Sequence, residues 1–214
     1  MDPSVGPFVY LASQSPRRRA LLDQVGIAHR PLLPGDAEDA EALEVVEAGE
    51  SPRGYVRRVV RLKADAALAR LARRGLPAAP ILVADTTVAL GRAILGKPDN
   101  AAHARRMLAS LSGRTHDVLT AVVVATAGRR DEAISASRVR FRTLTDADIA
   151  AYVATGEAFG KAGAYAIQGR AAAFVQRIAG SHSGIVGLPL FETMQLLERA
   201  DIPSLPPPTE TARP

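Results

Sequence analysis

The hydrophobic residues of this chain alternate between short continuous runs and stripes spaced three or four residues apart, which predicts strands interspersed with helices. The run "FVYLA" at 8–12 predicts a strand, and a helix follows it from the N-cap residue Ser15 to Gly26. A long amphipathic helix is expected over 55–75. Further strands are expected at 79–90, 117–126 and 134–144, and further helices from Asn100 to Leu111, over 146–155 and from about Pro189 onward.

The order of these elements predicts the fold class. The runs at 117–126 and 134–144 flank the turn sequence "AGRRDE", which predicts a β-hairpin and therefore an antiparallel strand pair. Together with the earlier alternation of strands and helices, this indicates an α/β fold with a mixed twisted sheet and flanking helices. Residues 31–54, rich in proline, glycine and acids, predict an irregular connection. We expect one domain over 1–203 and a proline-rich, disordered tail at 204–214.

Composition restricts the class of protein. The 214 residues can bury one substantial core, and no apolar run is long enough to span a bilayer, so no membrane partner is expected. The first ten residues lack the basic region and long apolar core of a secretory signal, so we expect a cytoplasmic location. The sequence has no cysteine and its four histidines lack paired metal-binding spacing, so any metal must be held by oxygen ligands. The net charge of +5 suits an anionic partner, or reflects solvated basic faces.

Three arginines stand at the wrong end of the first helix. Arg17, Arg18 and Arg19 occupy its first turn, where the helix dipole and unpaired backbone N–H groups already favour negative charge. A bound phosphate would make this arrangement favourable, because arginines at a helix N-terminus can hold phosphate oxygens in a bidentate manner. The alternative is that the arginines point outward into water at a small cost.

Three further residues carry charge where the pattern predicts burial or a tight turn. Lys63 lies within the apolar stripe of the helix over 55–75, and it either reaches toward the surface or faces an anion. Asp85 follows the buried run "ILVA", so a carboxylate stands at the end of a strand, where it can hold a divalent cation or accept a proton from water. Capping of the next turn is the alternative. Lys97, in "ILGKPD", adds a cation after a turn, with an ordinary loop lysine as the alternative.

The glycine-rich segments "KAGAYAIQG" and "GSHSGIVGLP" offer close backbone approach and amide donors rather than a nucleophile. Within the first, Gln168 has both a donor and an acceptor and is suited to reading a nucleotide base. These glycines match no phosphate-binding or dinucleotide-binding fingerprint. A serine triad built on His116 and Ser112 is not expected, because the chain has no Gly-x-Ser-x-Gly elbow.

Taken together and in order, seven segments resemble the Maf family of nucleoside triphosphate pyrophosphatases, also known as septum formation inhibitors. The resemblance covers roughly residues 8 to 198. It implies two lobes around a central cleft, as in Maf and ITPase proteins. The segments are "LASQSPRRRALLDQVGI", "YVRRVVRLKA", "VADTTV", "ILGKP", "MLASLSGRTHDVLTAV", "GKAGAYAIQG" and "GLPL".

The resemblance implies an activity and roles for residues. The family hydrolyses a nucleoside triphosphate between the α and β phosphates, giving the monophosphate and pyrophosphate with a divalent metal such as Mg, Mn or Co, and a homodimer is implied. Asp85 matches the catalytic acid and is expected to hold the metal. Glu38 is the chosen second metal ligand, although the stretch 36–44 offers several acids. The expected substrate-binding residues are Ser13, Arg17, Arg18, Lys63 and Lys97.

The segment "AGAYAIQG" resembles the family branch that acts on dTTP and UTP, in which positions matching Arg17, Thr86 and Gln168 are associated with base choice. Modified pyrimidine nucleotides are further expected substrates, in a housekeeping role. Gly160, where many relatives carry Asp, and Thr87, where Val is usual, depart from the family pattern. The alternatives are 7-methyl-GTP as substrate and a non-catalytic, nucleotide-binding regulator of cell division. Nucleic-acid binding through Arg138, Arg140 and Arg142 is not expected, because aromatic residues make up only 4% of the chain.

Overall fold

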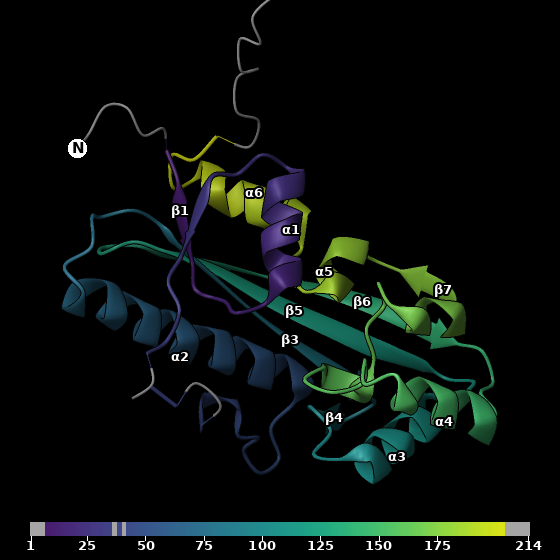
Figure 1. Ribbon diagram of the computed structural model, residues 1–214. Helices are drawn as coiled ribbons and strands as arrows, with labels where there is room; N and C mark the ends of the chain where they lie inside the picture. The colour runs from purple at the N-terminus through teal and green to yellow at the C-terminus, as the bar shows by residue number, and fades with distance from the viewer. Residues whose placement is uncertain (1–6, 36–37, 40–41, 204–214) are drawn as a thin grey trace, which may run out of the picture.

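The computed structural model describes residues 7–35, 38–39 and 42–203, so the predicted tail at 204–214 lies outside the described residues. The described residues form a seven-stranded mixed sheet with helices on both faces (Figure 1). The strands are β1 (Val9–Leu11), β2 (His29–Pro31), β3 (Ile81–Leu90), β4 (Ala93–Leu95), β5 (Thr115–Ala125), β6 (Arg130–Phe141) and β7 (Val175–Ala179). The α-helices are α1 (Pro16–Gln24), α2 (Pro52–Arg73), α3 (Ala101–Leu111), α4 (Asp146–Ala154), α5 (His182–Val186) and α6 (Leu190–Glu198), and the 3₁₀ turns are η1 (Ala42–Glu44), η2 (Ala162–Ala164) and η3 (Arg170–Phe174).

The strand order is β2-β1-β3-β5-β6-β7, with β4 paired to β3. The β2–β1 and β1–β3 pairs are parallel, whereas the pairs that β3 makes with β4 and β5, and those that β6 makes with β5 and β7, are antiparallel. The predicted α/β class with a mixed sheet is therefore confirmed. The predicted hairpin is β5–β6, and its turn is shorter than "AGRRDE" because β6 begins at Arg130.

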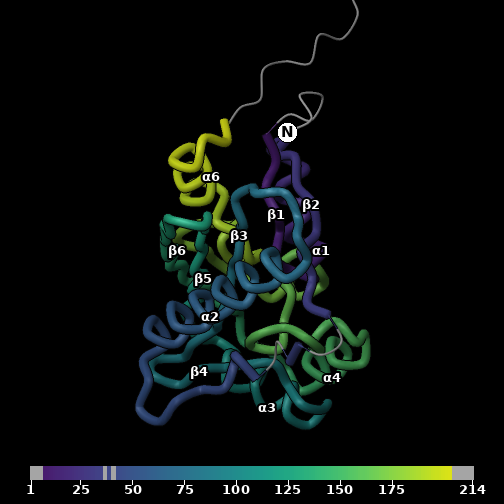
Figure 2. The backbone as a smooth tube through the Cα atoms, turned by 90° about the vertical axis from the view of Figure 1, so that its left-hand side faces the viewer, coloured from purple at the N-terminus to yellow at the C-terminus, as the bar shows by residue number. Residues whose placement is uncertain are grey.

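Helices cover the two faces of the sheet, and each face has its own hydrophobic core (Figure 1). On one face, α2 packs its apolar stripe against β3 and β5. On the opposite face lie α1, α5 and α6, and Figure 2 shows α3 and α4 at the end of the molecule away from α6. Successive residues of β3 serve the two cores in turn: Ile81 and Val83 belong to the α2 side, and Leu82 and Ala84 to the other.

A gap interrupts the sheet beside β3. β1 pairs with β3 only at Ile81 and Leu82, and β4 pairs with it only from Val88 to Leu90. Between them, residues 83–87 have β5 on one side and no strand neighbour among the described residues on the other. The loop after β1 and the residues after β4 both lie beside this gap. The topology therefore brings segments that are distant in sequence to the middle of β3.

Local signals explain where the predicted helices begin. The Ser51 hydroxyl accepts a hydrogen bond from the backbone N–H of Gly54 at 3.1 Å, so α2 starts at Pro52, three residues before the predicted start. The Asn100 side chain caps α3 in the same way through His103 N–H at 2.9 Å. Thr145 opens α4 with a reciprocal capping box. At α1, Pro16 is the first residue as expected, but the Ser15 side chain makes no cap; its N–H instead donates to Ser13 Oγ at 3.2 Å.

Two expectations need correction. Asp85 does not end a strand, because β3 continues to Leu90 and places the carboxylate at mid-strand; no turn follows that it could cap. The strands β2, β4 and β7 were not predicted, because each has only three to five residues and lies in a segment whose proline and glycine content indicated loops. In the described part of the chain, no helix has the length and apolar character needed to cross a bilayer.

Candidate active site

The gap beside β3 opens into a cleft of about 670 Å³. A volume of this order suits a nucleotide-sized ligand. Residues from the loop after β1, from α1, α2 and β3, and from the segment after β4 converge on it, although they are far apart in the sequence. The predicted site residues that line the cleft are Ser13, Arg17, Arg18, Glu38, Lys63, Asp85, Thr86 and Lys97.

At the α2 side of the cleft, two carboxylates share one ammonium group. Lys63 Nζ donates to Asp85 Oδ1 at 2.6 Å and to Glu44 Oε1 at 2.8 Å. Lys97 Nζ pairs with the other Glu44 oxygen at 2.9 Å. Asp85 is only 6% exposed, so its charge depends on this partner. Lys63 therefore uses its ammonium inside the cleft, and it is not a lysine that merely reaches toward bulk water.

Glu44 is a site residue that sequence reasoning did not single out. It lies in η1, within the acid-rich stretch 36–44, where irregular backbone gives no periodicity by which one acid could be preferred. The Tyr55 hydroxyl donates to the Glu44 carbonyl at 3.0 Å and fixes this turn on α2. Burial raises the pKa of the Glu44 carboxyl, but the nearby charges of Lys63 and Lys97 outweigh that effect and lower it overall.

Glu38 lines the same cleft but is bound by two arginines. Arg70, which is 4% exposed, donates from Nη2 to Glu38 Oε2 at 2.6 Å, and Arg73 Nη2 donates to Oε1 at 2.8 Å. Arg70 also donates to the Leu32 carbonyl at 2.9 Å. The hydrogen bonds from Arg70 lower the pKa of Glu38 to about 2. Of the two acids Glu38 and Glu44, the one that shares a cation with Asp85 is Glu44.

Arg18 is held on three sides. Its Nε donates to the Gly187 carbonyl at 2.7 Å, Nη1 to Ser13 Oγ at 3.1 Å and Nη2 to Thr86 Oγ1 at 3.4 Å. A guanidinium has five N–H donors, so each Nη group keeps one hydrogen for an anion. Burial lowers the pKa of Arg18, and the nearby Asp85 carboxylate opposes that shift. The three protein acceptors orient the group before any ligand arrives.

A second pair of cations lies at another wall of the cleft. Arg17 and Lys161 both line it, and no salt bridge joins either to a carboxylate among the described residues. Burial lowers the pKa of both side chains, and the charge of Arg17 lowers that of Lys161 further. Two neighbouring cations without a protein counter-ion are typical of an anion site. Lys161 was missed as a single residue, although its motif was noted; Arg19 is exposed and outside the cleft lining.

Gln168 is the predicted site residue that the structure does not bring to the cleft. It is exposed, whereas its neighbours Tyr165 and Ile167 line the cleft. Its role in reading a base stays a prediction. Thr86, also predicted to act in base choice, lies in the cleft and hydrogen-bonds to Arg18 and to Thr120.

His116 and Ser112 each bind other partners in the structure. His116 Nε2 lies 2.8 Å from the Tyr165 hydroxyl in a cluster of aromatic rings, and burial lowers the pKa of the imidazole to about 4. Ser112 exchanges hydrogen bonds with the backbone of Leu144. The expectation that the chain has no serine triad at these residues agrees with these contacts.

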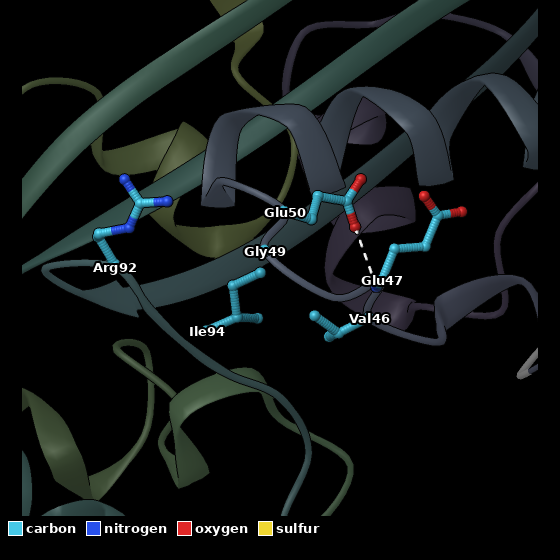
Figure 3. Close-up of a pocket in the computed structure, with 6 residues that line it drawn as sticks. All are labelled: Val46, Glu47, Gly49, Glu50, Arg92 and Ile94. Atoms are coloured by element: carbon cyan, nitrogen blue, oxygen red, sulfur yellow. Dashed lines mark hydrogen bonds between the residues drawn. The ribbon is translucent and has the colours of Figure 1, made fainter.

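A second, shallower hollow of about 380 Å³ lies outside the cleft, between the loop 46–50 and the β3–β4 hairpin (Figure 3). Glu47 and Glu50 stand on one side of it and Arg92 on the other. The Glu50 carboxylate is engaged by Arg58 at 2.7 Å. None of the predicted site residues lines this hollow.

The carboxylates of the cleft suit a divalent cation whose remaining ligands come from the substrate and water. Asp85 and Glu44 already converge on one positive group, the Lys63 ammonium. Among residues 7–35, 38–39 and 42–203, no group of three or more His, Cys, Asp or Glu side chains is placed to hold a metal. Magnesium is commonly bound by one or two carboxylates together with substrate phosphates and water. The two carboxylates fit that pattern.

A mixed α/β fold whose cleft surrounds a buried carboxylate with cations from distant segments defines a class of protein that binds a ligand with several negative charges. The chain matches the family described as Maf-like protein over residues 8–200, and it belongs to this family. The resemblance seen in the sequence is thereby confirmed.

Three similar proteins share the name dTTP/UTP pyrophosphatase. The protein of Ralstonia nicotianae called dTTP/UTP pyrophosphatase is 62% identical over 94% of this chain and 99% of its own length. Proteins with the same name from Burkholderia pseudomallei, 64% identical over 92% of this chain and 95% of their own, and from Albidiferax ferrireducens, 60% identical over 89% and 96%, are also similar.

Proposed function

We propose that this chain is a nucleoside triphosphate pyrophosphatase that hydrolyses dTTP and UTP to the monophosphate and pyrophosphate. The observation that carries the proposal is the meeting of Arg18, Lys63 and Lys97 around the buried Asp85 in one cleft. The relatives named dTTP/UTP pyrophosphatase, 60–64% identical over most of the chain, support the choice of substrate.

The cations bind and orient the triphosphate. Arg18 offers its two remaining Nη hydrogens to phosphate oxygens, while Ser13 sits beside it in the loop after β1. Arg17 and Lys161, which form no salt bridge with a carboxylate of residues 7–35, 38–39 and 42–203, supply further positive charge. Lys97 neutralises charge that develops on the departing pyrophosphate. Because the site is partly shielded from water, these fixed charges act more strongly than they would in solution.

Asp85 is the proposed proton acceptor. The oxygen of an attacking water forms a bond to the α-phosphorus while the bond from that phosphorus to the bridging oxygen breaks, and the water proton passes to the Asp85 carboxylate. Pyrophosphate leaves with the electron pair of the broken bond. Lys63, at 2.6 Å, orients the carboxylate for this task.

Asp85 and Glu44 are the residues that would hold the divalent cation, with Glu38 as the alternative second ligand. A bound Mg²⁺, Mn²⁺ or Co²⁺ supplies positive charge that polarises the phosphate and acidifies water. Both carboxylates are paired with two cations, so the choice of Glu44 over Glu38 rests on position: one cation of Glu44, Lys63, also binds Asp85, whereas the cations of Glu38 are Arg70 and Arg73.

Base choice is assigned to Thr86, Arg17 and Gln168, of which the first two line the cleft. The proposed biological role is removal of unwanted or modified pyrimidine nucleotides from the cytoplasmic pool, carried out by a homodimer. A purine such as 7-methyl-GTP is the alternative substrate.

A panel of nucleoside triphosphates tests the proposal. The full chain, incubated with magnesium and each of dTTP, UTP, dCTP, GTP, ATP and 7-methyl-GTP, should release pyrophosphate fastest from dTTP and UTP. A higher kcat/KM for 7-methyl-GTP would transfer the assignment to that substrate. Release from none of them, with tight nucleotide binding, would favour the non-catalytic regulator.

A further inference from the structure

A buried hydroxyl lies behind the wall of the cleft. Thr120, in the middle of β5, is 1% exposed and does not line the cleft. Its Oγ1 lies 2.9 Å from Thr86 Oγ1 on the neighbouring strand and 2.7 Å from the carbonyl oxygen of Gly184 in α5. Thr86 in turn accepts from Arg18. These contacts form a hydrogen-bond chain that joins α1, β3, β5 and α5.

The direction of every hydrogen in this chain is determined by chemistry. The Gly184 carbonyl can only accept, so Thr120 donates its single hydroxyl hydrogen to it. Thr120 then has no hydrogen left for Thr86, so the Thr86 hydroxyl donates to Thr120. Arg18 can only donate. The chain therefore runs from Arg18 to Thr86, from Thr86 to Thr120 and from Thr120 to Gly184.

This direction makes the Thr86 hydroxyl a hydrogen-bond acceptor toward the cleft. Its one hydrogen points away from the cleft into the sheet, so toward Arg18 and toward a ligand it presents only lone pairs. Without an acceptor at position 120 the Thr86 hydroxyl is free to rotate, and its hydrogen then points toward Arg18 in some rotamers. Two donors facing each other repel, which would displace the guanidinium from its three-point support at Gly187, Ser13 and Thr86.

We propose that Thr120 is a positioning residue that holds Thr86 as a hydrogen-bond acceptor and thereby keeps Arg18 oriented toward the anionic ligand. The proposal deepens the function proposed above and rests on it, since Arg18 is taken as a triphosphate ligand. Burial of a threonine does not by itself require such bonds: Thr193 in α6 is 0% exposed, and its hydroxyl has no hydrogen-bond partner among the described residues. The bonds of Thr120 are thus a specific feature of the site.

Binding without turnover tests the proposal directly. The affinity for dTTP is measured by calorimetry in EDTA for the wild type, Thr120→Val and Thr120→Ser. We expect Thr120→Val, which keeps the shape but removes the hydroxyl, to weaken binding by about tenfold, the usual effect of one neutral hydrogen bond. Thr120→Ser restores the hydroxyl and should bind within about twofold of the wild type. Thr193→Val, the same change at a buried hydroxyl outside the site, should bind as the wild type does.

A double-mutant cycle separates positioning from a general loss of stability. Because Thr120 acts through Thr86, Thr120→Val should have no further effect in a Thr86→Val background, whereas independent roles would add. Wild-type affinity in Thr120→Val, or additive losses in the cycle, would overturn the proposal. These outcomes differ from the one that would contradict the proposed function. That function fails if the wild type binds dTTP but releases no pyrophosphate with magnesium.

Discussion

The ammonium of Lys63 lies 2.6 Å from the carboxylate of Asp85, although one residue belongs to a helix and the other to the middle of a buried strand. The side chains are 18% and 9% exposed. A buried carboxylate of this kind requires a positive partner, and an apolar helix face tolerates a lysine for the same reason. Each residue therefore explains the other, and the pair is the centre from which the remaining charges of the cleft are arranged.

Replacing Asp85 with Asn should nearly abolish turnover, by a factor of roughly 10² to 10⁴, because the amide keeps the shape of the carboxylate but does not accept a proton. The fold should persist, since Lys63 retains Glu44 as a partner. Pyrophosphate release from dTTP and circular dichroism measure the two properties. Asp65→Asn, at an exposed acid paired with Arg130, is the matched control and should keep wild-type rates. Wild-type activity in Asp85→Asn would remove Asp85 from the mechanism.

Replacing Lys63 with Met should impair triphosphate use more than folding. The substitution removes the ammonium that Asp85 and Glu44 share and leaves Lys97 paired with Glu44 and Arg18 near Asp85, so we expect kcat/KM to fall at least roughly tenfold. Kinetics with dTTP and thermal unfolding are compared with those of Arg61→Met, which removes an exposed α2 cation paired with Glu132. A large drop in Tm with normal kinetics would mean that Lys63 serves only the structure.

Glutamine substitutions distinguish the two candidate metal ligands. If Glu44 joins Asp85 in holding the cation, Glu44→Gln should raise the magnesium concentration for half-maximal activity by roughly tenfold or more. Glu38→Gln should leave that concentration unchanged, because its carboxylate lies with Arg70 and Arg73 rather than with the ammonium that Asp85 binds. Magnesium titrations of pyrophosphate release provide the measurement. The opposite result, a shift for Glu38→Gln alone, would assign the ligand to Glu38.

Acid should weaken the contact that Glu38 makes with α2. Arg70 lowers the pKa of Glu38 from its usual value of 4.5 to about 2 in the folded chain. The ionised Glu38 carboxylate therefore stabilises the folded state fully above about pH 4.5, and its contribution to the free energy of unfolding is lost as the pH falls toward 2. Urea unfolding at pH 6 and at pH 3 should therefore show that the free energy of unfolding falls more for the wild type than for Glu38→Gln. Glu47→Gln, at an exposed acid, should lose as much as the wild type; equal losses in all three proteins would contradict the assignment.

The sequence predicts elements well where a local signal and the tertiary fold agree. Ser15 with Pro16 marked the start of α1 and Asn100 marked α3, because helix starts depend on contacts within a few residues. The three arginines after Ser15 also pointed to an anion site, and two of them line the cleft. Here the physical conflict between charge and helix dipole was itself the signal.

Other features depend on partners that are distant in sequence. Arg70 continues the buried stripe of α2, and only Glu38 and the Leu32 carbonyl explain why a charge is tolerated there. Glu44 could not be chosen among several acids until Lys63 and Lys97 were placed beside it. Thr120 resembled an ordinary strand threonine, because its role depends on a hydroxyl of β3 and a carbonyl of α5.

Consecutive residues of β3 point to opposite faces of the sheet, and the interrupted pairing beside them leaves both Asp85 and Thr86 at the cleft. Asp85 points to α2 and its lysine, while Thr86 points to α1 and its arginine. Both residues line the cleft but contact different helices, so a substitution that reshapes ligand preference at Thr86 need not remove the contact that Asp85 makes with Lys63. Such independence between adjacent positions would allow this architecture to diversify its choice of nucleotide over evolutionary time while its cleavage chemistry stays the same.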